Sequence, residues 1–139
     1  MGAPLTVLYD LDCGFCRWTV ALVLRLDRAG RLRPVGIQSP EGERLLAGMT
    51  PEERLAAAHV VTADGRILSG GAAAPAVAAA LPGGAPLAAA LSRLSGPVDR
   101  AYRWVADHRT GLSRFVPERS KRRAVQRIER HAARFRARR

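Results

Sequence analysis

The sequence predicts an α/β protein, a sandwich of helices on a mixed sheet of about four strands. Short apolar runs alternate with longer amphipathic stretches, which is the order of elements in such a sandwich. The length of 139 residues and the 47% of hydrophobic residues are enough for one domain with its own core. Aromatic residues make up only 5%, so we expect a core built mainly from Ala, Leu and Val.

The first part of the chain predicts a strand, a helix and a second strand. Residues 5–9 (LTVLY) are an apolar run typical of a buried strand. The apolar spacing over residues 14–28 predicts a helix, and Gly30 is placed to end it. Residues 32–37 predict the second strand, and Pro34 indicates an edge of the sheet or a bulge, because proline cannot donate a ladder hydrogen bond.

Two short helices and a hairpin are expected next. Residues 40–47 predict a short helix, and residues 50–53 (TPEE) are typical of a capped helix start. Residues 59–62 and 67–68 predict two antiparallel strands, because Asp64-Gly65 between them favours a hairpin turn.

The rest of the body is helical in pattern, over residues 72–81, 87–94 and 97–108. The order strand, helix, strand, hairpin, helix is that of the thioredoxin-like fold, here followed by extra C-terminal helices. One face of the last of these helices is apolar: Val98, Ala101, Tyr102 and Val105.

Charge divides the chain into two parts. The net charge is +11, but residues 114–139 carry 11 Lys and Arg against 2 Glu, whereas residues 1–113 carry 12 Arg against 10 acids. We therefore expect a domain over residues 1–113 and a basic amphipathic helix over residues 114–139. The apolar residues of this helix share one face: Val125, Ile128, Ala132 and Phe135.

The sequence predicts neither export nor membrane insertion. The start, MGAPLTVLYD, lacks the basic and apolar regions of a signal peptide. The weakly polar stretch 70–91 is interrupted by Pro75, Pro82 and Pro86, which disfavours a membrane span. We expect a cytoplasmic protein, where free thiols stay reduced.

The most informative segment is DLDCGFCR, residues 10–17, where the first strand passes into the first helix. Cys13 is expected at the helix N-cap, where free N–H groups and the helix dipole stabilise a thiolate. Cys13 is thus the candidate nucleophile, and Cys16, one turn later, is the candidate resolving thiol of a disulfide-exchange cycle. Such a cycle requires no bound cofactor. The candidate tuning residues are Asp10, Asp12, Arg17 and His59.

The roles of the acids stay open at this point. If they are ionised and close, Asp10 and Asp12 oppose the Cys13 thiolate, and Arg17 offsets them. Either acid is alternatively a proton acceptor for Cys16 or a cap for the helix.

At these residues the chain resembles the DCC family of thiol-disulfide oxidoreductases, whose Asp-Cys-x-x-Cys pattern matches Asp12-Cys13 and Cys16. The resemblance covers about residues 5–113 and implies a thioredoxin-like fold and a redox activity. The implied substrate is a protein or small-molecule disulfide or thiol, and the reductant is not identified. Weaker matches follow in order: Gln38, Asp64-Gly65-Arg66, Gly70, Ala72, Tyr102 and Arg109.

One loop departs from thioredoxins, which carry a cis-proline there that faces the cysteines. This chain has Ala56-Ala57-Ala58-His59 before the third strand. His59 is a candidate to face the cysteines instead, although we favour a structural, hydrogen-bonded histidine.

The same residues allow other interpretations. The cysteines could bind a metal, but a structural zinc needs four ligands, and the three histidines have no paired spacing, which leaves a site shared between two chains. Asp10-Leu11-Asp12 is similar to the Asp-x-Asp pattern of haloacid-dehalogenase-type phosphatases, but the only lysine is Lys121, in the basic tail. Trp18 and Trp104 are expected in the core. Tyr102 and Arg109 are expected to be mainly structural, with Arg109 paired to an acid.

The basic helix allows an alternative function. We favour a helix whose apolar stripe packs on the domain while its arginines are solvated. The alternative is a non-catalytic binding module for an anionic membrane, an acidic partner or nucleic acid. No specific nucleic-acid recognition is expected, because the sequence does not indicate a basic surface interleaved with aromatic residues of the kind that reads RNA bases.

Overall fold

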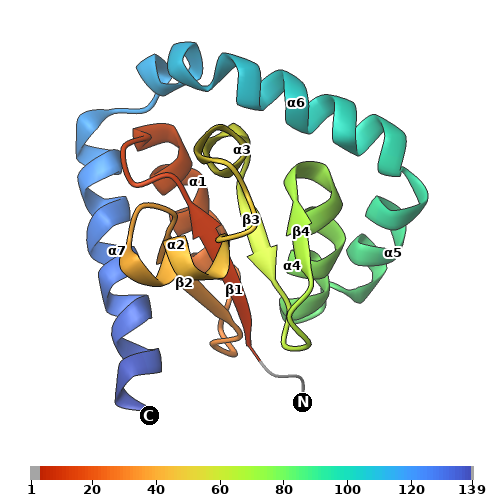
Figure 1. Ribbon diagram of the computed structural model, residues 1–139, viewed down its shortest axis with the longest axis horizontal. Helices are drawn as coiled ribbons and strands as arrows, with labels where there is room; N and C mark the ends of the chain where they lie inside the picture. Colours follow the sequence, from red (N-terminus) through yellow and green to blue (C-terminus); the bar gives the residue numbers. More distant parts are fainter. Residues whose placement is uncertain (1–3, 139) are drawn as a thin grey trace.

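The computed structural model describes residues 4–138 and shows a four-stranded sheet between layers of helices (Figure 1). The strands are β1 (Leu5–Tyr9), β2 (Leu32–Gly36), β3 (His59–Val61) and β4 (Ile67–Ser69). The helices are α1 (Gly14–Leu26), α2 (Pro40–Leu45), α3 (Pro51–Ala56), α4 (Ala74–Ala80), α5 (Ala85–Arg93), α6 (Ser95–Leu112) and α7 (Glu118–Ala137), with short 3-10 turns η1 (Gly70–Ala73) and η2 (Ser113–Phe115).

The sheet has the strand order β2-β1-β3-β4 and mixed strand directions. β1 pairs in parallel with β2 and antiparallel with β3, and β3 pairs antiparallel with β4 through the predicted hairpin. Pro34 lies in β2, which is an edge strand as its proline predicts. This mixed sheet with its helices confirms the predicted α/β, thioredoxin-like sandwich with C-terminal helices.

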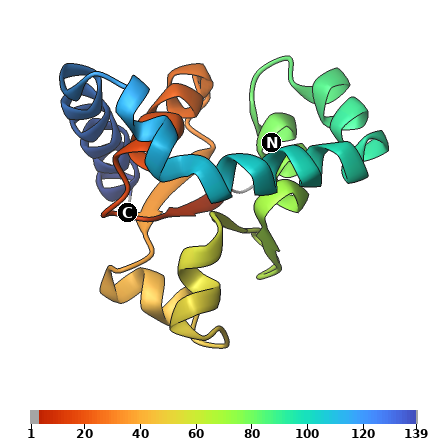
Figure 2. The same cartoon turned by 90° about the horizontal axis from the view of Figure 1, so that it is seen from above.

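Side chains of β1 alternate between two cores, because successive strand residues point to opposite faces. Tyr9 packs with residues of α1, α4 and α7, whereas Leu8 packs with Val35, Ile37 and Leu46 on the other face. Figure 2 shows this layering, with α2 and α3 on one side of the sheet and α1, α4 and α7 on the other. The central strand is therefore buried on both faces, and its carboxyl end leads directly to the cysteines.

The basic C-terminal segment forms α7, which packs beside α1 (Figure 1). Of the predicted stripe only Ile128 is buried, while Val125, Ala132 and Phe135 are half-buried. The buried face of α7 also contains Ala124, which lies outside the predicted stripe and packs in the core. The buried His131 ring also hydrogen-bonds the buried Asp27 carboxylate, with 2.9 Å between Nε2 and Oδ2. Asp27 in turn accepts the backbone N–H groups of Arg31 and Leu32, so one carboxylate joins the end of α1, the start of β2 and the middle of α7.

The helix α1 ends two residues before the predicted Arg28. Asp27 takes the cap position because its carboxylate is used by the following loop. Gly30 then adopts a left-handed backbone with φ of 66°, which a glycine reaches without strain and which turns the chain into β2.

The helix α6 crosses the end of the sheet at which the cysteines lie (Figures 1 and 2). None of its residues is buried, and Trp104 is 56% exposed and stacks on His108. The expectation that Trp104 belongs to the core was therefore wrong, because α6 packs along a narrow edge and not on a face of the sheet. Trp18, in contrast, packs partly buried against the core. Within residues 4–138, the helices are all too short or too polar to cross a membrane.

Candidate active site: the cysteine pair and its neighbours

Cys13 is the N-cap residue of α1, as the sequence predicts. Its extended backbone lets its sulfur accept the N–H of Cys16, with 3.2 Å between Sγ and N. The loop from β1 is closed by a bond from the Cys13 N–H to the Asp10 carbonyl oxygen, 3.4 Å long. The sulfur of Cys13 thus takes the place of a serine or aspartate cap and receives one of the unpaired N–H groups of the helix start.

In this environment the two thiols have different pKa values. The pKa of Cys13 is lowered to about 6, first by a hydrogen bond from the Cys16 thiol and also by the Cys16 N–H and the charge of Arg109. Burial and the charge of Asp10 act in the opposite direction. The pKa of Cys16 is raised, first by its hydrogen bond to Cys13 and then by burial. These two shifts favour a thiolate on Cys13 and a protonated thiol on Cys16 near neutral pH.

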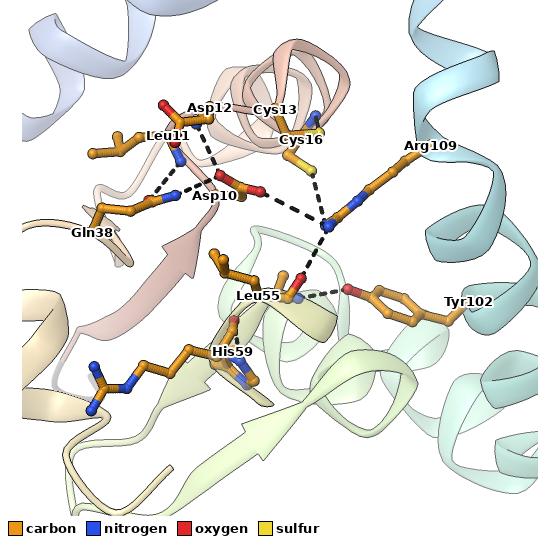
Figure 3. A network of polar contacts seen from close by, with 12 residues as sticks. Asp10, Leu11, Asp12, Cys13, Cys16, Gln38, Leu55, His59, Tyr102 and Arg109 are labelled. Carbon is orange, nitrogen blue, oxygen red and sulfur yellow. Dashed lines mark hydrogen bonds and ion pairs between the residues drawn. The ribbon is translucent and has the colours of Figure 1, made fainter. Parts of the chain in front are cut away.

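The cation at the pair is Arg109, which reaches it from α6 (Figure 3). Its Nη1 lies 4.0 Å from Cys16 Sγ, and its Nη2 lies 3.1 Å from the carbonyl oxygen of Leu55 and 3.9 Å from Asp10 Oδ2. A single guanidinium therefore joins the cysteine pair, the acid that follows β1 and the end of α3. Arg109 was expected to be mainly structural and was not among the candidate site residues; only its place in the family resemblance pointed to it.

Asp10 is held in place by a network of hydrogen bonds (Figure 3). Its Oδ1 accepts the Asp12 N–H at 2.9 Å and the side-chain amide of Gln38 at 2.6 Å. The same Gln38 side chain accepts the Leu11 N–H at 2.9 Å. Asp10 thereby braces the loop between β1 and α1, whereas Asp12 is exposed beside it. Of the two acids, Asp10 is the one that Arg109 links to the cysteine pair.

The side chain of Arg17 contacts the loop between β1 and α1 and not the cysteine sulfurs. Its Nη1 donates to the carbonyl oxygen of Leu11 at 3.0 Å, and its buried Nε has no hydrogen-bond partner among residues 4–138. Arg17 was expected to offset the negative charge of the acids near Cys13. The guanidinium beside the cysteine pair belongs instead to Arg109. Arg17 instead supports the loop that carries Cys13.

His59 is buried and fully hydrogen-bonded within its own neighbourhood. One ring nitrogen bonds the Ser69 hydroxyl at 2.7 Å and the other bonds the Arg54 carbonyl oxygen at 2.9 Å. In Figure 3 the ring lies beyond Leu55, apart from the cysteines. The hypothesis that His59 faces the cysteines was therefore wrong, because its place in β3 directs the ring toward β4 and α3, and the favoured structural interpretation holds.

The loop before β3 is tied to α6. Ala58 donates its N–H to the Tyr102 hydroxyl at 2.8 Å, next to the bond from Arg109 to Leu55. A cavity of about 120 Å³ lies between this loop, α1 and α6, and it is lined by Cys16, Phe15, Tyr102 and Arg109 among others. Tyr102 and Arg109 thus hold the segment that contains a cis-proline in thioredoxins, and residues 4–138 contain no cis peptide bond.

In the part of the chain that the structure describes, no three His, Cys, Asp or Glu side chains are grouped as a metal site requires. The cysteines are both free thiols, half-buried at the start of α1. What the site contains is therefore the thiol pair, one acid and one guanidinium.

A Cys-x-x-Cys pair at the N-terminus of the first helix of a thioredoxin-like fold, with an acidified first thiol, defines a thiol-disulfide oxidoreductase site. Comparison with known families agrees with this class. Residues 7–115 match the DCC1-like thiol-disulfide oxidoreductase family, and the chain belongs to that family. No curated protein and no solved structure matches the chain. The family match does not favour the alternative of a non-catalytic binding module, nor that of a phosphatase.

Because the pKa of Cys13 is lowered, its reactivity should rise at a lower pH than that of an ordinary thiol. The rate of Cys13 alkylation by iodoacetamide should rise as pH increases through about 6 and level off above it, because the thiolate is the nucleophile. A stopped-flow pH series with mass identification of the labelled cysteine measures this. Glutathione in the same series is the reference, and its rate should still rise above pH 8 or so. A Cys13 profile that follows glutathione would contradict the assigned thiolate.

Proposed function

We propose that the protein catalyses thiol-disulfide exchange, with Cys13 as the nucleophile and Cys16 as the resolving thiol. The observation that carries the proposal is the N-cap position of Cys13, whose sulfur receives hydrogen bonds from both the N–H and the thiol of Cys16. These bonds stabilise the attacking thiolate and keep the second thiol in contact with it.

In the reducing direction the cycle has two exchange steps. The Cys13 thiolate attacks a substrate disulfide, which forms a mixed disulfide and releases one substrate thiolate that takes up a proton. Cys16 then loses its proton and attacks the Cys13 sulfur, which releases the second substrate thiolate and leaves a Cys13–Cys16 disulfide. An external dithiol or two thiols return the two electrons, and in the oxidising direction every step is reversed.

The mixed disulfide also activates Cys16. The first cause of its raised pKa is the hydrogen bond to Cys13, and the charge of Cys13 adds to it. Both vanish when Cys13 becomes part of a mixed disulfide, while Arg109 remains 4.0 Å from Cys16 Sγ and lowers the pKa of that thiol. Cys16 is thus kept protonated until its attack is required, and we assign Arg109 as a positioning residue for both thiols.

The substrate is proposed to be a protein or small-molecule disulfide or thiol. The cavity beside Cys16 is small and lined largely by apolar side chains, with Arg109 and Asp10 as its charged members. The proposed setting is the cytoplasm, where thiol systems re-reduce such a pair, because the chain has only two cysteines and they serve the site.

A redox titration of the pair against glutathione, read by alkylation and intact mass, tests the proposal. We expect a reversible two-electron transition with a potential between roughly −120 and −270 mV.

Arg109→Met should shift the potential by about 10–30 mV to more negative values, because the reduced form loses a cation that stabilises its thiolate. Arg100→Met, an exposed arginine of the same helix, is the matched control and should leave the potential unchanged. If no Cys13–Cys16 disulfide forms at any ratio of glutathione, the function is rejected.

A further inference from the structure

A groove with a volume of about 450 Å³ runs between α1 and α7. It begins near the cysteine pair, where the Lys121 side chain of α7 lies against Gly14, the residue that follows Cys13. Trp18 of α1 and Ser120 of α7 line the groove at that end. The groove then follows the two helices away from the cysteines, toward Arg25 and Arg130.

The α1 side of the groove is mainly apolar. Trp18, Ala21 and Leu22 lie three and four residues apart, so they form one stripe along the helix. Leu22 is 37% exposed although it stands in the middle of this stripe. Arg25 continues the stripe one turn later with a positive charge. The α1 side therefore offers an apolar contact that ends in a cation.

The α7 side of the groove is positively charged. Arg123, Arg127 and Arg130 line it, and they share one flank of the helix. Both acids of α7, Glu118 and Glu129, lie outside the groove. Within residues 4–138, neither these three arginines nor Arg25 forms an ion pair with a carboxylate. Their charge is thus concentrated on one side and uncompensated by the protein.

We propose that this groove docks an acidic, amphipathic segment of a partner protein. Apolar side chains of the segment would pack on Trp18 and Leu22, while its carboxylates would pair with the arginines of α7, as in helix-in-groove recognition. The proposal is independent of the thiol chemistry. Because α1 forms one side of the groove, a segment bound there lies next to the helix that carries the cysteine pair.

The two other anionic surfaces that a basic helix can bind fit this place less well. A membrane surface needs an apolar face that projects outward, whereas Trp18 and Leu22 line a hollow. The phosphate backbone of a nucleic acid would match the arginines but would leave the apolar α1 side without a partner. An acidic amphipathic peptide matches both sides of the groove.

The probe is a fluorescein-labelled amphipathic peptide of about 15 residues, with Leu on one face and Glu on the other. Binding is followed by anisotropy and by tryptophan emission in a Trp104→Phe background, where Trp18 is the sole tryptophan.

We expect R123E/R127E to weaken binding by about tenfold or more, because both substitutions place a negative charge in the groove. The matched control, R122E/R136E, has the same net charge and lies outside the groove, so it should change affinity by less than about twofold. L22N keeps the charge and should weaken binding by about threefold.

Several outcomes overturn the proposal. Equal losses in the two double variants would mean diffuse attraction to a basic protein, and an unchanged Trp18 emission would place the peptide elsewhere. Tighter binding of a random DNA duplex, or of phosphatidylserine vesicles, that R123E/R127E abolishes would assign the groove to nucleic acid or membrane. No binding of the peptide by the folded protein also rejects it. Circular dichroism and Cys13 alkylation of each variant show that the fold and the thiol pair are intact.

Discussion

Replacement of Cys13 by serine is expected to abolish disulfide reduction, whereas replacement of Cys16 by serine should stop the cycle at the mixed disulfide. In the first variant the attacking thiolate is missing, and the remaining thiol of Cys16 has a raised pKa and little thiolate. In the second variant the backbone N–H of residue 16 still donates a hydrogen bond to the Cys13 sulfur, and Cys13 can still attack the substrate disulfide. Turnover should fall by at least about a thousandfold in both, because each removes one of the two exchange steps.

Turnover is measured with a fluorogenic peptide disulfide and dithiothreitol. The trapped adduct is identified by intact mass in a separate reaction with the peptide disulfide alone, because dithiothreitol would reduce it. Cys16→Ala is the matched control for Cys16→Ser, since alanine also removes the hydroxyl that can donate to the Cys13 sulfur. Cys13 of the alanine variant should be alkylated more slowly near pH 6 than Cys13 of the serine variant, because the thiol hydrogen bond is the first cause of its lowered pKa. Full turnover by Cys13→Ser would refute the assigned roles.

Substitution of Asp27 by alanine is expected to destabilise the protein by about 3–5 kcal/mol. Asp27 is fully buried and accepts hydrogen bonds from Arg31 N–H and Leu32 N–H, and His131 bonds the same carboxylate. Removal of the carboxylate leaves these groups without their partner in the interior, and it releases α7 from the end of α1. His131→Ala should cost less, because Asp27 then keeps its two backbone donors.

Urea unfolding measures the free energy of unfolding, and limited trypsin digestion reports on α7, which is rich in arginine. We expect Asp27→Ala to lower the urea midpoint and to speed cleavage within α7. Asp107→Ala, the same substitution at an exposed position of α6, is the control and should change stability by less than about 0.5 kcal/mol. An unchanged midpoint in Asp27→Ala would show that α7 is held by apolar packing alone.

Those features that depend on neighbours in the sequence were predictable from it. β1 has the predicted bounds, and the capping box of Thr50 and Glu53 starts α3 as expected. The edge position of Pro34 and the N-cap position of Cys13 also follow from local rules. In each case the residue type itself limits the backbone or supplies the hydrogen bond, so a few adjacent residues are sufficient.

The surroundings of the cysteines were decided only by the tertiary structure. Arg109 stands 93 residues from Cys16, and the path of α6 across the end of the sheet brings the two together. The same path leaves Trp104 in solvent, and the pairing of β3 with β4 turns His59 toward Ser69. The sequence by itself determined which cysteine would cap α1 and have its pKa lowered there, because a helix N-terminus acts on the residue that caps it. It did not determine which cation would tune that thiol, because a long side chain acts through space on whatever the packing of distant elements places beside it.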